Sequence, residues 1–76
     1  MNLPEGWTSE AAYDERYLLV HSAPPKRYMA TIDWQERCVR TGFVTRGPAI
    51  SKKEYGGRGW RDAIVADAVE HLRSIP

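Results

Sequence analysis

The chain has 76 residues, of which 42% are hydrophobic and 28% charged, with a formal net charge of +1. This length allows one domain with a thin core, and the composition is not that of a chain disordered throughout. No apolar run approaches the roughly 20 residues of a membrane span. The N-terminus does not resemble a signal peptide, and a single cysteine, Cys38, leaves no internal disulfide, so we expect a cytoplasmic protein.

The first 16 residues mix helix formers with helix breakers. Thr8 or Ser9 is a suitable N-cap, and Glu10 would then lie in the first turn of a helix. A helix this short is marginal unless it packs on the core. Residues 1–16 are therefore predicted to form either a short helix or an irregular arm.

Segments rich in β-forming residues come next, and they span residues 17–22, 28–34 and 38–44. Pro24 and Pro25 interrupt the pattern after the first segment, because neither can donate to a ladder. Residues 35–37 form the turn after the second segment. Connections this short predict an antiparallel meander over residues 17–45.

Alternating side chains give the predicted sheet two different faces. Ala30 and Ile32 lie on an apolar face, whereas Thr31 and Asp33 lie on the other. Arg40 belongs to the polar face by the same alternation. We expect this polar and basic face to be open to solvent.

The last 31 residues divide into a loop and a helix. Residues 46–59 are basic and rich in glycine, and a loop this long in a small domain usually has a function or is mobile. Residues 60–75 carry one apolar stripe, with Asp62 near the start and Arg73 near the end, which is typical of an amphipathic helix.

Together these elements predict a single α+β domain over residues 1–76. A three-stranded antiparallel sheet would be packed on one face by the C-terminal helix. The expected core consists of Leu18, Val20, Ile32, Val39, Phe43, Ile64, Val65, Ala68, Leu72 and Ile75, with Trp34 and Trp60 at its edges.

Catalytic and metal-binding patterns are weak in this sequence. Cys38, His21 and His71 are the conventional nucleophile and base candidates, but they are far apart and lack a local signature. The spacings typical of zinc and calcium sites do not occur. We therefore expect a protein that is not an enzyme and that holds no metal or other cofactor.

The distribution of charge is the feature that favours a partner. Residues 1–24 sum to −3, residues 25–61 to +6 and residues 62–76 to −2. Glycines at 56, 57 and 59 precede the predicted helix, whose first N–H groups attract anions, although they also serve a plain tight turn. The basic segment favours DNA or RNA binding. The candidate phosphate-binding residues are Lys52, Lys53, Arg58 and Arg61, with Arg27, Arg40 and Arg46 extending the surface.

Two other interpretations of the charge pattern stay open. The clusters are also compatible with the ordinary charged surface of a small soluble domain. Alternatively, the chain is a protein-interaction or accessory domain, including a homodimer in which an exposed strand edge or the acidic N-terminal arm meets the basic middle of a neighbour. None of these interpretations involves a membrane.

Overall fold

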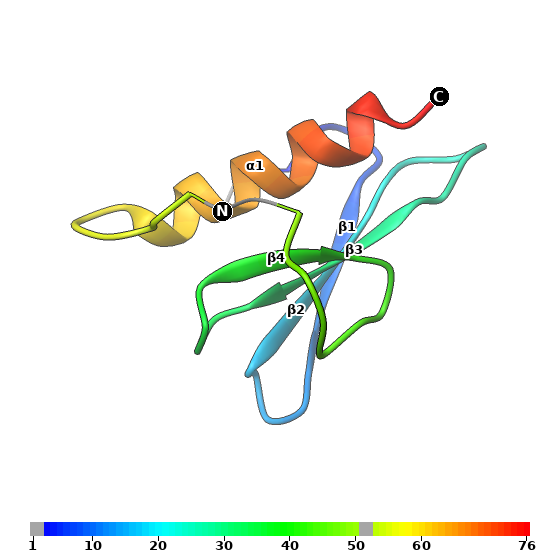
Figure 1. Cartoon of the computed structure of the whole chain (residues 1–76). Coiled ribbons are helices and arrows are strands. Elements are labelled where there is room, and N and C mark those ends of the chain that lie inside the picture. The colour runs from blue at the N-terminus through cyan, green and yellow to red at the C-terminus, as the bar shows by residue number, and fades with distance from the viewer. Residues whose placement is uncertain (1–2, 51–52) are drawn as a thin grey trace.

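A computed structural model describes residues 3–50 and 53–76, and Figure 1 shows its architecture. The described residues form an antiparallel sheet of four strands in the order β1-β2-β3-β4, followed by one helix that lies across one face of the sheet. No helix in this part of the chain has the length and apolarity needed to cross a membrane. The elements are β1 (Thr8–Ala12), β2 (Tyr17–His21), β3 (Met29–Asp33), β4 (Cys38–Thr41) and α1 (Trp60–Ser74).

The prediction for the N-terminal segment is wrong, because Thr8–Ala12 is an edge strand rather than a helix or an irregular arm. The sheet accordingly has four strands instead of three. β1 pairs with β2 in a register that places Ala11 opposite Leu18. Ladder pairing with a buried neighbouring strand outweighs the local capping signal, as tertiary context often does for short helices.

The turn between β1 and β2 explains why residues 8–21 carry no hairpin signal. Tyr13, Asp14 and Glu15 all adopt left-handed backbone conformations, with φ of 53°, 52° and 66°. Glycine or asparagine usually occupies such positions. The turn is closed by the backbone N–H of Arg16, which donates to the Tyr13 carbonyl at 3.0 Å.

The hydrophobic core lies between α1 and the sheet, as predicted. The core residues with no exposed surface come from both layers: Val20, Ala30, Ile32, Val39, Ile64 and Ala68. Phe43 is an incorrect core prediction, since 46% of its surface is exposed. β4 ends at Thr41, and Gly42 (φ 70°) then turns the chain, so the strand alternation no longer places Phe43 inside.

The second face of the sheet is not open to solvent, contrary to expectation. Residues 42–47, which we call the strap, return across it from the end of β4. The Thr31 hydroxyl donates to the carbonyl of Gly42, and the Arg40 Nε donates to the carbonyl of Gly47 at 3.0 Å. The residues buried on this face are Tyr17, Leu19, Thr31, Asp33 and Arg40.

Candidate basic and aromatic binding site

The seven residues predicted to bind phosphate do not form one surface. Arg58 and Arg61 lie at the start of α1, whereas Arg27 lies in the β2–β3 loop near the opposite end of the helix (Figure 1). The Lys53 ammonium is 3.4 Å from the Asp67 carboxylate. Of the others, Arg46 is exposed on the strap, Arg40 is buried, and Lys52 lies outside the described residues.

Two arginines and two tryptophans meet where α1 begins. Trp60 is the first residue of the helix, and its ring centroid is 5.8 Å from that of Trp34, just beyond β3. The Arg37 guanidinium carbon is 4.0 Å from the Trp60 centroid. That of Arg61 is 4.7 Å from the Trp34 centroid and 4.9 Å from the Trp60 centroid. We call these four residues the Arg–Trp cluster.

The turn between β3 and β4 positions Arg37. Its backbone is left-handed (φ 52°), a conformation that a non-glycine residue adopts at a cost of roughly 1 kcal/mol. Its Nη1 donates to the carbonyl of Tyr55 at 3.0 Å, which ties the turn to the loop before α1. The side chain is therefore held over Trp60 while the residue remains exposed.

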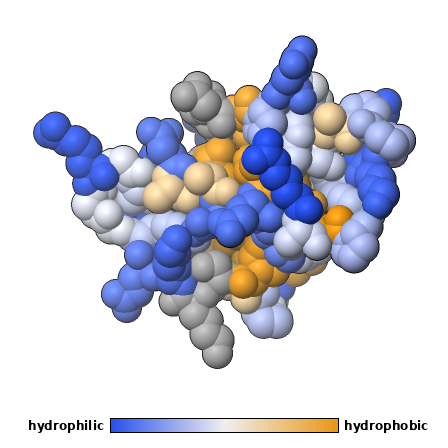
Figure 2. Space-filling model, turned by 90° about the horizontal axis from the view of Figure 1, so that it is seen from above, coloured by the Kyte–Doolittle hydropathy of each residue, from blue (hydrophilic) through white to orange (hydrophobic). Residues whose placement is uncertain are grey.

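The loop before α1 supplies a third exposed arginine, Arg58. The helix has Gly59 at its N-cap, in a left-handed conformation with φ 79°, and no side chain caps it. Gly57 is also left-handed. The left-handed backbone therefore explains why glycine occupies positions 57 and 59, without a role in anion binding. Viewed from above α1, hydrophilic side chains project from the end of the molecule that holds this loop (Figure 2).

Arg40 has a structural role that the sequence did not indicate. Its guanidinium donates from Nη1 to the Cys38 sulfur at 3.0 Å and from Nη2 to the Glu36 carboxylate at 3.4 Å. Nη1 is also 3.6 Å from the carboxylate of Asp33, which has no exposed surface. Arg40 thus stabilises the interior of the second face, and we do not include it in the binding site.

Asp33 is the centre of this buried network. Its Oδ1 accepts the backbone N–H groups of Gln35 and Glu36 at 3.0 and 3.1 Å. Arg16 donates to the same carboxylate, and hydrogen bonding to Asp33 raises the pKa of Arg16. The carboxylate therefore fixes the β3–β4 turn that carries Arg37.

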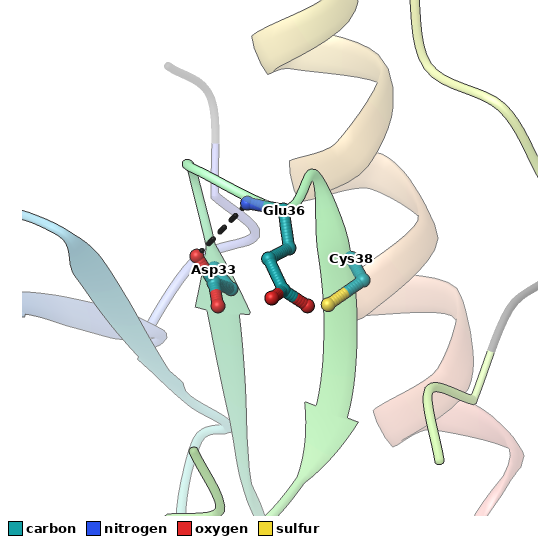
Figure 3. Close-up of side chains that lie close together, drawn as sticks. All are labelled: Asp33, Glu36 and Cys38. Atoms are coloured by element: carbon teal, nitrogen blue, oxygen red, sulfur yellow. Dashed lines mark hydrogen bonds between the residues drawn. The ribbon is translucent and has the colours of Figure 1, made fainter. Parts of the chain in front are cut away.

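Asp33, Glu36 and Cys38 form a group that could be mistaken for a metal centre. One ligand atom from each lies within 4.8 Å of the others, and Figure 3 shows the three side chains converging. The Arg40 guanidinium already donates to two of the three and carries the positive charge that a cation would supply. We therefore interpret this group as an ion-pair network.

The three conventional catalytic candidates contact different neighbours. His71 Nε2 is 3.0 Å from the Thr41 hydroxyl, and His21 Nε2 is 3.5 Å from the Glu10 carboxylate. Cys38 contacts Arg40 instead. Burial raises the pKa of the Cys38 thiol, a change that Arg40 opposes. A raised pKa disfavours the thiolate, which is the nucleophilic form.

The Cys38 thiol is expected to react slowly in the folded protein. At about pH 8, alkylation by iodoacetamide should be several-fold slower than in the urea-unfolded chain, because less thiolate is present. The folded state holds this proton more tightly than the unfolded chain. The protonated Cys38 thiol therefore makes its full contribution to the free energy of unfolding below the ordinary cysteine pKa. This contribution is lost as the pH rises through the raised pKa. Equal alkylation rates in the two states would contradict this expectation.

Comparison of the chain with protein-family models, curated proteins and solved structures found no match. The site must therefore be judged from its residues. The sequence itself offers Arg37 beside Trp34, and Arg58 and Arg61 beside Trp60, as basic and aromatic pairs that suit nucleic acid. Arg58 and Arg61 were among the predicted phosphate-binding residues, whereas Arg37 was not, and both tryptophans were assigned to the edge of the core. The signal in the sequence was a basic turn residue, Arg37, three positions after Trp34. Its significance depends on Trp60, which lies 26 residues after Trp34 in the chain and contacts both residues only in the folded protein.

Proposed function

We propose that this protein is a small non-enzymatic module that binds nucleic acid through the Arg–Trp cluster and Arg58. The observation that carries the proposal is the cation–π contact of two exposed arginines, Arg37 and Arg61, whose guanidinium carbons lie 4.0 and 4.9 Å from the centroid of the Trp60 ring. The expected ligand atoms are the phosphate oxygens of DNA or RNA.

Contact between a guanidinium and a ring supports phosphate binding for a geometric reason. A guanidinium that lies against an indole ring still has its N–H donors in the plane of the group, where they can meet a phosphate in a bidentate manner. Because Arg37 and Arg61 are already held against the rings, binding a phosphate costs them less side-chain entropy. Aromatic and basic side chains also alternate in many surfaces that hold single strands.

The size of the site indicates weak binding without strong sequence preference. Arg37, Arg58 and Arg61 would neutralise about three phosphates, and each contact contributes a slope of about −0.9 to the dependence of log K on log salt for duplex DNA. We therefore expect a dissociation constant in the micromolar range at low salt and a steep loss of affinity as salt is added.

A charge-matched pair of triple variants tests the proposal. The site variant replaces Arg37, Arg58 and Arg61 by Gln. The control variant replaces by Gln three cations outside the cluster, which are Lys26 and Arg27 in the β2–β3 loop and Arg73 in the last turn of α1, so both variants lose the same charge. Affinity for labelled single-stranded and duplex oligonucleotides is measured by fluorescence anisotropy at low salt, and folding is checked by circular dichroism.

The site variant is expected to lose about tenfold or more in affinity, and the control variant about threefold or less. Equal losses would mean that net charge, rather than the cluster, attracts nucleic acid. The proposal would be overturned by that result, or by a wild-type protein that does not bind either oligonucleotide at low salt.

A further inference from the structure

Three large hydrophobic side chains lie exposed together on the face of the sheet opposite α1. Tyr13 is 64% exposed, Phe43 46% and Val44 41%. The ring centroids of Tyr13 and Phe43 are 5.9 Å apart, and Val44 follows Phe43 on the strap. We call these residues the Tyr13–Phe43 surface. It does not include any residue of the Arg–Trp cluster.

The fold holds this surface in place from both sides. The Tyr13 ring stands edge-on against the ring of Tyr17, which is buried, with centroids 5.5 Å apart. The strap that carries Phe43 is tied to the sheet at Gly42 by Thr31 and at Gly47 by buried Arg40. Apolar side chains that are anchored this way lose little conformational entropy when a partner covers them.

Opposite charges adjoin the surface on different segments of the chain. Asp14 and Glu15 are exposed beside Tyr13, in the turn that joins β1 and β2. Arg46 is exposed on the strap, on the side of β4. The acids therefore adjoin the surface through the β1–β2 turn, and the arginine adjoins it through the strap. In a two-fold arrangement, residues on one side of an interface meet those of the other side across the axis.

We propose that the Tyr13–Phe43 surface is the contact face of a homodimer in which Arg46 of each copy meets Asp14 and Glu15 of the other. Self-complementary charge is the reason to choose a second copy over an unrelated partner. The dimer goes beyond the proposed function and does not depend on it, because the two surfaces share no residue.

The dimer is expected to be weak and concentration-dependent. A standard interface buries about 800 Å² per partner, which is about 15% of the accessible surface of 5209 Å². Three exposed apolar side chains provide only the centre of such an area. We therefore expect monomers at micromolar concentration and dimers as the concentration approaches millimolar.

Sedimentation equilibrium across that concentration range tests the proposal with a charge-swap series. Arg46→Glu and Glu15→Lys should each weaken association about tenfold, because like charges then face each other across the axis. The double variant carries both reversals and should recover most of the lost affinity. Arg27→Glu, which makes the same charge change as Arg46→Glu but lies away from the surface, should associate like the wild type.

The proposal also predicts that Phe43→Ser abolishes association while the far-ultraviolet circular dichroism is unchanged, since Phe43 is outside the core. A monomer mass at every concentration would overturn it. So would a dimer that survives Phe43→Ser, or a double variant weaker than both single reversals. Each of these results would leave the nucleic-acid proposal intact, and the triple glutamine variant tests that proposal separately.

Discussion

Replacing Asp33 by Ala is expected to destabilise the protein by about 3–5 kcal/mol, the usual cost of removing one partner from a buried ion pair. The Asp33 side chain is only 1% exposed and accepts from two backbone N–H groups as well as from Arg16. Its loss leaves the buried guanidinium of Arg40 with one carboxylate partner, that of the exposed Glu36. A domain of this size has roughly 4–11 kcal/mol of stability in all, so the variant should be largely unfolded or close to it.

The measurement is urea unfolding followed by circular dichroism, with Glu36→Gln as the matched control. Glu36 also binds Arg40 but is exposed, and its replacement should cost about 1 kcal/mol or less. Asp33→Asn, which keeps the shape and an acceptor oxygen, should lie between the two. If Asp33→Ala and Glu36→Gln were equally mild, the buried network would not be the feature that holds the second face together.

Replacing Ile64 by Ala is expected to cost about 2–5 kcal/mol, the range for large-to-small substitutions in a core. Ile64 has no exposed surface and belongs to the cluster formed by α1 and the sheet, with Ile32 and Val39 on the opposite side. The substitution removes three carbons and leaves a cavity in a core that has few residues to refill it.

A graded series separates packing from helix propensity. Ile64→Val should cost only about 0.5–1.5 kcal/mol. Ala63→Ser, next to it on the exposed face of α1, should cost about 0.5 kcal/mol, as expected from propensity alone. Thermal unfolding monitored by circular dichroism gives all three values. A cost for Ile64→Ala no greater than that for Ala63→Ser would contradict the observed docking of α1.

The part of the fold with clear periodicity was predictable from the sequence. β2, β3 and β4 fall within the predicted segments, and α1 ends one residue before the predicted limit. β1 was missed because the left-handed positions of the β1–β2 turn are occupied by Tyr13, Asp14 and Glu15. Hairpin turns are usually recognised in a sequence by glycine or asparagine at such positions. The edge position of β1 added to the difficulty, since a half-exposed strand has a weak alternating pattern.

The candidate site was predictable only in part. Arg58 and Arg61 could be chosen because they stand among glycines at the start of an evident helix. Arg37 could be noted beside Trp34, but its contact with Trp60 could not be predicted, because that contact depends on the β3–β4 turn meeting the helix. Arg40 illustrates the opposite error. Alternation placed it on the polar face correctly, but nothing in a local pattern shows that the strap returns to cover that face.

By itself the sequence determined the α+β class, the core stripe of the helix and a basic segment between acidic flanks, because composition, periodicity and charge are local properties of the chain. Only the tertiary structure decided which basic side chains are available to a partner. In the folded chain Arg40 is buried beside Asp33, whereas Arg37 and Arg61 lie against the two tryptophans. A local sequence pattern does not show these contacts, because ion pairs and cation–π contacts join groups that are close in space but separated in sequence.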